Sequence, residues 1–320
     1  MKVLVVIVNY RTADLTIDCL RSLVDEVAAV PGGVKVVVTD NASGDDSIAR
    51  IGKAIEDNGW FAWATLMPLA SNGGFAWGNN QAIEPALKSA DPPEFIYLLN
   101  PDTLMKPGGL RELVNFLDKN PKVGIAGGAT VNDQGEPLSS GFRFHTVLGE
   151  LEGSLRLGVA SKLLQKHIVA TGAHTQAQEV DWVVGASMMI RREVFDSIGL
   201  FDSNYFMYFE EVDFCARAKR GGWSVWIVPQ SEIVHLVGQS SGIQIGAKKQ
   251  KRRPRYWFES RHRFFLRNYG VAKTILADMA FAWGYSMHRI ISALRMRPST
   301  DPPWLLWDFL RYNLTSWSHR

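Results

Sequence analysis

"VLVVIVNYR", residues 3–11, runs through six apolar positions and then turns abruptly polar. A continuous apolar run that is rich in β-branched residues is typical of a parallel strand covered on both faces. The same run resembles the start of a signal peptide, but it breaks at Asn9 and no small-residue cleavage site follows it. We therefore interpret residues 3–8 as the first buried strand of a sheet.

Similar apolar runs alternate with amphipathic stretches along the first 120 residues. The spacing of apolar residues predicts a helix over residues 12–23 and another after Pro107. Further strands are predicted at residues 34–39, 62–67 and 95–99. This alternation of strands and helices predicts an α/β fold with a doubly wound, mostly parallel sheet.

Polar loops follow the predicted strands, and they begin at Asn9, Asp40, Asn72 and Asn100. In open α/β sheets, ligands bind beyond the carboxyl ends of the strands. We therefore expect a ligand site where these four loops meet.

Two of these loops contain an aspartate that allows two interpretations. In "LLNPDT" (98–103), Asp102 follows a buried strand directly, where its carboxylate can bind a divalent cation or cap the following turn. In "DNAS" (40–43), Asp40 and Asn41 can contact a nucleoside, although capping of the loop is the simpler explanation of these residues alone. For both aspartates, the sequence around them alone leaves the ligand-binding and the capping interpretation open.

The loop "SNGGFAWGNN" (71–80) is more informative. Its paired glycines allow the backbone to approach a ligand closely, and its asparagines lie near a predicted helix N-terminus, which favours anions. The spacing matches neither the dinucleotide-binding fingerprint nor the P-loop. We favour contact with phosphate or sugar over a purely structural turn.

The stretch "YFEEVDFCAR" (208–217) places three carboxylates within four positions, among aromatic residues. In a helix, Glu210 and Asp213 lie on one face and Glu211 lies about a quarter-turn away. A solvated acidic helix is the usual explanation, but the aromatic neighbours indicate burial. The cluster fits better a site in which one carboxylate takes a proton from a substrate while the others orient it.

His235 follows a predicted strand at residues 223–229 and can serve as a neutral imidazole ligand of the same cation. A lone histidine is more often structural. The segment 145–180 carries no motif and is interpreted as a variable insertion. Two distant cysteines, Cys19 and Cys215, form no metal-binding pattern and predict reduced thiols in a cytosolic protein.

The charge distribution divides the chain. Residues 246–320 hold 15 Lys and Arg against 4 Asp and Glu, a balance of +11, whereas residues 1–245 hold 20 and 28, a balance of −8. We predict a catalytic domain over residues 1–245, with halves at about 1–120 and 121–245, and a basic, aromatic, helical extension over 246–320.

The extension allows several partners. Its basic and aromatic residues suit an anionic membrane surface, the diphosphate of a lipid-linked substrate or non-specific nucleic acid. Residues 274–294 have the length of a membrane span, but Asp278, His288 and Arg289 interrupt them. We predict helices that lie on a membrane or pack on the catalytic domain, and we expect no specific nucleic acid.

Taken in order, these motifs resemble a family 2 glycosyltransferase of the rhamnosyltransferase-like branch, over roughly residues 3–237. The resemblance is carried by "VVIVNYR", "DNAS", "NGGFAWGNN", "LLNPDT", "VDWVVGASMMIRREVFDSIGLFD", "YFMYFEEVDFCAR" and a later histidine. It implies a GT-A fold, a nucleotide-diphosphate sugar donor, Mg²⁺ or Mn²⁺, and an inverting displacement.

The resemblance also implies a role for individual residues. Glu211 matches the general base, with Glu210 and Asp213 in support, although many relatives have Asp at the base position. Asp102 and His235 match metal ligands. The residues implied in binding the nucleotide sugar are Asn9, Asp40, Asn41, Asn72, Gly73, Gly74, Phe75, Asn79 and Asn100, and those implied in the acceptor or sugar pocket are Trp182, Gly185 and Ala186.

The implied activity is transfer of a sugar, L-rhamnose from dTDP-rhamnose, to a lipid-linked saccharide in cell-envelope polysaccharide synthesis. Members of this branch act on polyprenyl-diphosphate sugars, which implies a cytoplasmic protein on the inner face of the cell membrane. The alternatives are transfer of another hexose or galactofuranose from a UDP-sugar, or a catalytically silent sugar-nucleotide-binding protein.

Overall fold

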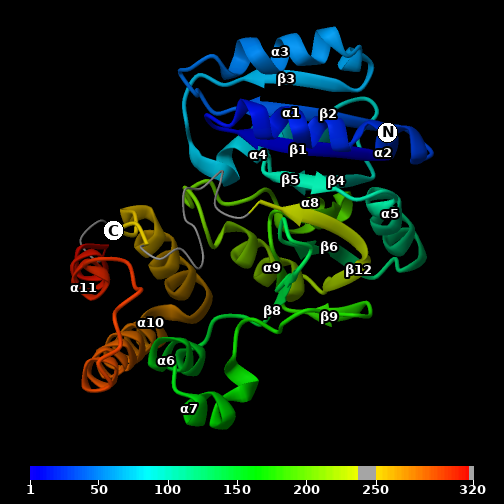
Figure 1. Ribbon diagram of the computed structural model, residues 1–320. Coiled ribbons are helices and arrows are strands. Elements are labelled where there is room, and N and C mark those ends of the chain that lie inside the picture. Colours follow the sequence, from blue (N-terminus) through cyan, green and yellow to red (C-terminus); the bar gives the residue numbers. More distant parts are fainter. Residues whose placement is uncertain (237–249, 317–320) are drawn as a thin grey trace.

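A mixed sheet forms the centre of the computed structural model, which describes residues 1–236 and 250–316 (Figure 1). Its strands are ordered β3-β2-β1-β4-β11-β6-β12-β5. These strands are β1 (Val3–Asn9), β2 (Val34–Asp40), β3 (Ala64–Pro68), β4 (Phe95–Leu99), β5 (Thr103–Met105), β6 (Val123–Val131), β11 (Ser187–Arg191) and β12 (Ser224–His235). Two short strands, β7 (Pro137–Leu138) and β9 (Gln178–Val180), pair with β6 and β12.

Strand β1 is buried along its whole length, as its continuous apolar run predicts. Its alternate side chains enter two separate cores: Val3, Val5 and Ile7 on one face, and Leu4 and Val6 on the other. The helices of the first face are α1 (Ala13–Ser22), α3 (Ser47–Asp57) and α5 (Gly109–Lys119); those of the second are α4 (Gly74–Leu87), α8 (Arg192–Ile198) and α9 (Glu210–Arg220). A short α2 (Val24–Ala29) follows α1. The predicted doubly wound, mostly parallel sheet is confirmed.

Parallel pairing aligns the strand ends that carry the predicted site. Strands β3, β2, β1 and β4 are all parallel, and the register places Asn9 directly beside Asp40. The order of strands reverses between β1 and β4, which is where ligands bind in such sheets. Asn9 ends β1, and Asn100 directly follows β4.

The apolar stretch "VDWVVGASMMI" (180–190) predicts a single buried strand, and this prediction is wrong in part, because the chain turns at residues 184–186. Before the turn, β10 (Trp182–Val183) pairs with β8 (Gly141–Phe142) in a separate two-stranded sheet. After it, β11 enters the main sheet antiparallel between β4 and β6. The two segments have different partners, so a single strand is impossible. The predicted third strand also starts later, at Ala64, since residues 60–62 form a 3-10 turn.

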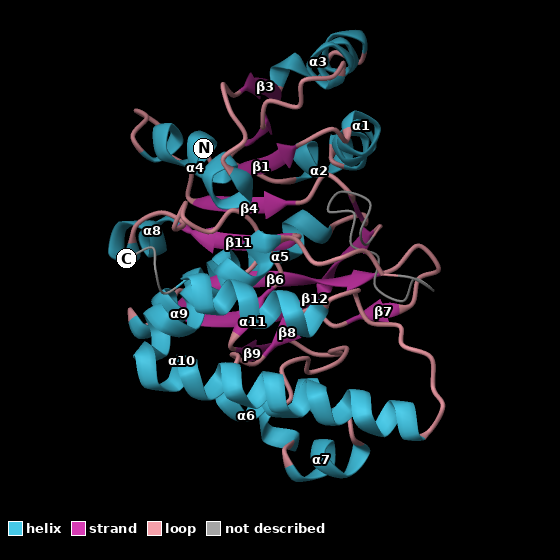
Figure 2. Cartoon of the chain, turned by 90° about the vertical axis from the view of Figure 1, so that its left-hand side faces the viewer, coloured by secondary structure: helices cyan, strands magenta, loops and turns pink. Residues whose placement is uncertain are grey.

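The C-terminal part of the described chain is helical, as predicted. Helix α10 (Arg255–Leu294) breaks at Gly270 into arms of residues 255–269 and 271–294. The first arm adds Phe264 and Phe265 to the core beneath α9, so it is continuous with the core of the second predicted half, residues 121–245. The second arm lies along α6 (Val147–Leu155), which with α7 (Gly158–Leu163) comes from the segment interpreted as a variable insertion (Figure 2). Helix α11 (Leu305–Ser316) packs on α10.

Two statements about the extension follow from its helices. Among residues 1–236 and 250–316, no helix combines the length and hydropathy that a membrane crossing requires. The basic start of the predicted extension at residues 246–249 lies outside the described residues. The proposed boundary at 245/246 stays a prediction.

Arg261 connects both arms of α10 to α6. Its guanidinium is 1% exposed and forms ion pairs with Glu150 of α6, at 2.8 Å, and with Asp278 of the second arm, at 2.6 Å. Burial alone would raise the pKa of Glu150, but the charges of Arg261 and His145 outweigh it and lower the pKa to about 2. Glu150 is therefore ionised, and its carboxylate and the guanidinium of Arg261 depend on each other.

Helix α4 joins the two halves of the molecule, because it is hydrogen-bonded to the loop between α8 and α9. The backbone N–H of Phe75 donates to the carbonyl of Phe206 at 2.8 Å. The amide of Asn80 donates to the carbonyl of Phe201 and accepts from the N–H of the same residue. A methyl group at Gly74 would lie 1.9 Å from the oxygen of Phe206, and the φ of Gly74 is +87°. Only glycine fits at this position.

Replacing Arg261 with Met should strongly destabilise the protein. The change leaves the carboxylates of Glu150 and Asp278 buried without their cation, which costs about 3–5 kcal/mol. Urea unfolding measures this loss. The control is Arg255→Met, which removes an exposed i,i+4 pair with Glu259 and should cost less than about 1 kcal/mol. Equal losses for both variants would contradict the connecting role of Arg261.

Gly74→Ala should also destabilise, because the added methyl group overlaps the Phe206 carbonyl and the backbone is left-handed. We expect a loss of more than about 2 kcal/mol in urea unfolding. Gly153→Ala is the matched control, since Gly153 lies in α6 with open space around it and should gain about 0.5–1 kcal/mol. A neutral Gly74→Ala variant would show that the contact between the halves is loose.

Candidate active site

The loops after β1 and β2 form one buried hydrogen-bonded network. Asn9 donates its side-chain amide to Oδ2 of Asp40 at 2.6 Å, and the hydroxyl of Ser43 donates to the same oxygen at 2.6 Å. The N–H of Ser43 donates to Oδ1 of Asp40 at 3.0 Å. The three side chains are fully buried. Asp40 therefore caps its own loop, as the simpler interpretation expected; its predicted contact with a nucleoside stays a prediction.

Asn41 extends this network to the glycine-rich loop. Its side-chain amide donates to the carbonyl of Gly74 at 3.0 Å, and its Oδ1 lies against Gly78, where a methyl group would approach to 2.8 Å. Asn72 accepts from the N–H of Gly74, which closes the turn before α4. Asn79, one turn further on, donates to the carbonyl of Phe75. The structure thus brings the first three predicted nucleotide loops together.

The glycine pair is explained by contacts within the protein. A methyl group at Gly73 would lie 2.4 Å from the ring of Trp77, and Gly74 packs on Phe206. Close approach is required, as the sequence indicated, and the groups approached are the ring of Trp77 and the backbone of Phe206. Contact between this loop and a donor stays a prediction.

The acidic helix α9 begins after a strained turn. Tyr208 and Phe209 both have left-handed backbone angles, with φ of 70° and 66°. Each costs about 1–3 kcal/mol and persists only where its surroundings hold it. The first arm of α10 supplies those surroundings, because Phe264 packs on Phe209 and the Ser260 hydroxyl donates to the carbonyl of Met207. Such strain concentrates at functional sites.

Glu210 and Glu211 form the first turn of α9, where the positive end of the helix dipole favours carboxylates. Glu210 is buried and Glu211 is half-buried. Burial raises the pKa of Glu211 to about 7, and burial together with the charge of Glu211 raises the pKa of Glu210 well above its usual range. In both side chains Oε2 is buried and has no hydrogen-bond partner within the described residues. A pair of this kind is suited to taking up a proton near neutral pH.

Asp213 has a different environment from the two glutamates. It is fully buried and accepts from Arg217 at 2.9 Å and from Asn268 of the first arm at 3.1 Å. Arg217 in turn donates to the carbonyls of Ile198 and Leu200. Asp213 thereby ties α9 to α8 and α10, and its predicted support of the base stays a prediction.

The turn at residues 184–186 lies between the strand ends and the acidic helix. A methyl group at Gly185 would lie 3.2 Å from Cε1 of Phe75 and 4.0 Å from Cβ of Glu211. The carbonyl of the next residue, Ala186, accepts from the N–H of Asn100 at 3.3 Å. One short segment thus contacts helix α4, the end of β4 and the predicted base.

Trp182 precedes this turn in β10 and is buried. Its ring stacks on Phe142 with 4.2 Å between centroids, and its indole N–H donates to the carbonyl of Arg143. The ring of His145 lies 6.2 Å from Trp182 and 5.0 Å from Phe209. Aromatic rings therefore form a continuous wall from the predicted acceptor pocket to the acidic helix.

Asp102 and His235 are adjacent, as the predicted metal site requires. Strand β12 pairs with β5, and Oδ1 of Asp102 lies 3.4 Å from Nε2 of His235. Among the described residues, no group of three or more His, Cys, Asp and Glu side chains can hold a metal ion. One carboxylate and one imidazole still fit a divalent cation whose remaining ligands are diphosphate oxygens and water.

Several residues that hold the site gave no signal in the sequence. Arg11 and Ala42 share with Tyr208 and Phe209 a left-handed backbone, and all four flank the site. Left-handed φ at residues other than glycine, asparagine and aspartate is rare and has no sequence signature. The side chains that organise the loops and were not anticipated are Arg11, Ser43, Asn80, His145 and Arg217.

Two rhamnosyltransferases are similar to this chain over most of its length. N-acetylglucosaminyl-diphospho-decaprenol L-rhamnosyltransferase of Mycobacterium tuberculosis is 25% identical over 220 residues, which cover 65% of this chain and 68% of the relative. The dTDP-rhamnosyl transferase RfbF of Shigella flexneri is 24% identical over 238 residues, which cover 72% of this chain and 70% of the relative.

A solved structure and a family model agree with these relatives. The mannosyltransferase PcManGT from Pyrobaculum calidifontis, in complex with GDP-Man and Mn²⁺, superposes with a TM-score of 0.54 at 17% identity, covering 99% of this chain and 86% of that chain. The chain has the GT-A fold that the resemblance implied. Residues 2–258 match the model described as glycosyltransferase like family 2. The chain therefore belongs to glycosyltransferase family 2.

Proposed function

We propose that this glycosyltransferase transfers its sugar with inversion, and that Glu211 is the general base. The observation that carries the proposal is the turn at residues 184–186, which contacts both Glu211 and the end of β4 that leads to Asp102. A sugar bound beside Gly185 would lie between the base and the leaving group. The raised pKa of Glu211 supports this role, since a base near pKa 7 is efficient at neutral pH.

The proposed reaction is a single displacement. An acceptor hydroxyl gives its proton to Glu211 as its oxygen forms a bond to the anomeric carbon. The bond from that carbon to the diphosphate oxygen breaks on the opposite face, and the nucleoside diphosphate leaves with the electron pair. Glu210 stays protonated beside Glu211, because two carboxylates so close in a buried site cannot both ionise readily.

Asp102 and His235 would hold the divalent cation, Mg²⁺ or Mn²⁺. When bound, the cation neutralises negative charge on the diphosphate. Asn9, Asn41 and, in the second turn of α4, Asn79 would bind the nucleotide. Buried Oδ1 atoms of Asn41 and Asn79 have no hydrogen-bond partner within the described residues, which supports a ligand at these loops.

The proposed donor is dTDP-L-rhamnose and the proposed acceptor is a lipid-linked saccharide at the inner face of the cell membrane, in cell-envelope glycan synthesis. The names of the two relatives support both assignments: one acts on a diphospho-decaprenol and the other is a dTDP-rhamnosyl transferase. A UDP-hexose or UDP-galactofuranose donor and a silent nucleotide-sugar-binding protein are the competing outcomes.

A panel of nucleotide sugars tests the donor. With Mg²⁺ or Mn²⁺ present, dTDP-rhamnose should raise the melting temperature more than UDP-sugars or GDP-sugars do. A ligand at a hundredfold excess over its Kd stabilises the folded state by about 2.7 kcal/mol. Differential scanning fluorimetry measures the shift. A larger shift with a UDP-sugar would overturn the rhamnosyl assignment and leave the transferase assignment intact.

The pH dependence of transfer tests the base. Only ionised Glu211 accepts a proton, so kcat should rise as pH increases through about 7 and level off above it. Glu211→Gln should lower kcat by at least about a hundredfold while the donor still raises the melting temperature. The control is Glu259→Gln, an exposed glutamate of α10 that should leave the rate and its pH profile unchanged. Retained activity in Glu211→Gln would exclude this residue as the base.

A further inference from the structure

The outer side of the second arm of α10 is apolar and faces solvent. Apolar side chains recur there at positions three or four residues apart or multiples of that spacing, which places them on one face of the helix. Each is between 44% and 79% exposed, and together we call them the apolar face: Val271, Ile275, Met279, Trp283, Ile290 and Leu294. The opposite side of the arm packs on α6 and α11. The apolar face spans residues 271–294 and is about 36 Å long.

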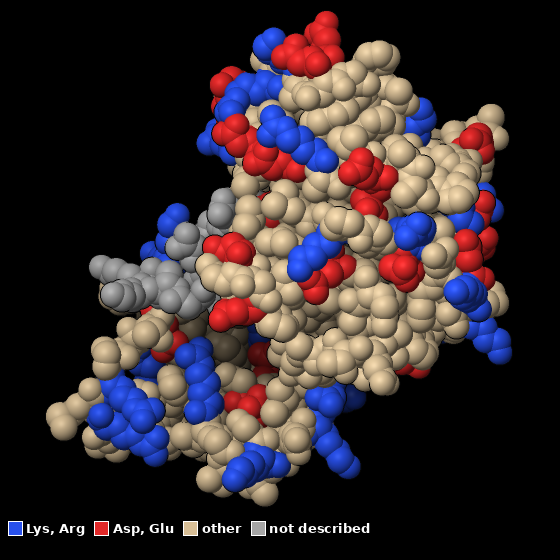
Figure 3. Space-filling model, turned by 45° about the vertical axis from the view of Figure 1, so that its right-hand side comes forward, with Lys and Arg blue, Asp and Glu red and all other residues tan. Residues whose placement is uncertain are grey.

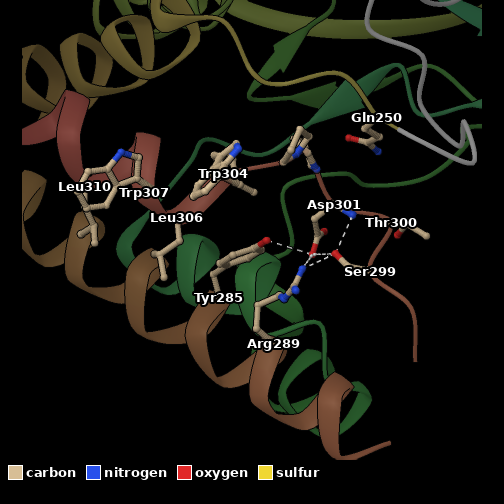
Figure 4. A pocket seen from close by; sticks show the side chains of 13 residues that line it. Gln250, Tyr285, Arg289, Ser299, Thr300, Asp301, Trp304, Leu306, Trp307 and Leu310 are labelled. Atoms are coloured by element: carbon tan, nitrogen blue, oxygen red, sulfur yellow. Dashed lines mark hydrogen bonds and ion pairs between the residues drawn. The ribbon is translucent and has the colours of Figure 1, made fainter. Parts of the chain in front are cut away.

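Two further exposed tryptophans lie at the start of α11, the helix that packs on α10. Trp304, just before α11, and Trp307 within it are 70% and 61% exposed, and Leu310 follows one turn later. With Tyr285 and Arg289 of α10 they line a cavity of about 670 Å³ (Figure 4). The apolar walls come from α11, and the polar end is made by Arg289, Ser299 and Asp301, which interact with one another.

The acidic residues of the extension are all neutralised within the protein. Each forms an ion pair with an arginine at 2.6 to 2.7 Å: Glu259 with Arg255, Asp278 with Arg261, Asp301 with Arg156 and Asp308 with Arg252. The exposed cations Lys273, Arg295 and Arg297 lie on the same arm or directly after it. Figure 3 shows blue side chains with few red ones on the lower left of the molecule, where the extension lies. The charge offered to a partner there is positive.

We infer that the apolar face, together with Trp283, Trp304 and Trp307, inserts into the interface of an anionic lipid bilayer. Tryptophan favours that interface, and an amphipathic helix with basic flanks lies in its plane. The absence of a spanning helix among the described residues agrees with a helix that lies on the surface. Lys273, Arg295 and Arg297 would contact the phosphate headgroups.

This inference deepens the proposed function, because it names the surface that brings the site to a lipid-linked acceptor. Only the identity of the acceptor rests on the proposed function, because the apolar face is observed independently of Glu211. A second copy of the chain is the rival occupant. Charge favours the bilayer, since two copies meeting through this face would bring like charges together.

Sedimentation of the full-length protein with vesicles tests the inference. The protein should bind vesicles of phosphatidylcholine mixed with phosphatidylglycerol more strongly than vesicles of phosphatidylcholine alone, and added salt should weaken that binding. The triple variant Trp283→Ser/Trp304→Ser/Trp307→Ser should bind at least about tenfold more weakly, because three large apolar side chains no longer leave water. Arg295→Gln/Arg297→Gln should lose about fivefold for each charge, on anionic vesicles only.

Phe61→Ser is the matched control. Phe61 is 76% exposed but lies in the turn beside α3 and β3, at the end of the molecule far from α10 (Figure 1), so its vesicle binding should equal that of the wild type. The melting-temperature shift with donor reports the proposed function separately and should be the same in all variants. Failure of the wild type to bind anionic vesicles would overturn the inference. So would a dimer in sedimentation velocity that the triple variant converts to monomers.

Discussion

The first turn of α4 packs on the backbone at Phe206 so closely that only glycine is accommodated at position 74. This contact fixes the distance between the half of the molecule that carries the predicted nucleotide loops and the half that carries the acidic helix. Phe75 follows directly and lies against Gly185, which in turn lies against Glu211. Because interiors are close-packed, a shift at any of these positions displaces the others. The proposed chemistry therefore depends on a contact made by groups that take no part in it.

The second constraint is electrostatic. Two adjacent glutamates are held in a poorly solvated first turn of α9, where burial makes ionisation costly and raises both pKa values. Packing around the start of α9 compensates for this cost. The start of the helix is fixed by the aromatic side chains around Phe209, by the left-handed turn before the helix and by the buried pair of Asp213 with Arg217. The buried carboxylates lower the stability of the fold, and the packing around them compensates for this loss, which is typical of catalytic sites.

In the extension, too, the acidic side chains are compensated by contacts within the protein. Its acidic residues are paired with arginines of the same chain, and Arg261 joins both arms of α10 to α6, whereas the apolar face and the cations Lys273, Arg295 and Arg297 are exposed. The first arm supports the strained turn before the acidic helix, while the second arm presents the apolar face. One kinked helix thus connects the proposed base with the surface that we infer to meet lipid, and Gly270 sets the direction of the second arm.

The sequence by itself determined the strands of the first half, the helices with clear apolar stripes, and the family, because these follow from local periodicity and from motifs that are contiguous in the chain. It also indicated that Asp102 and His235 belong together and that the acids of α9 are buried. Only the tertiary structure decided that β11 enters the sheet antiparallel, that the glycine pair packs on protein, and that Asp213 binds Arg217 and Asn268. Each of these depends on contacts between residues distant in the chain, or on left-handed backbone at Tyr208 and Phe209, and neither leaves a periodic signal in the sequence.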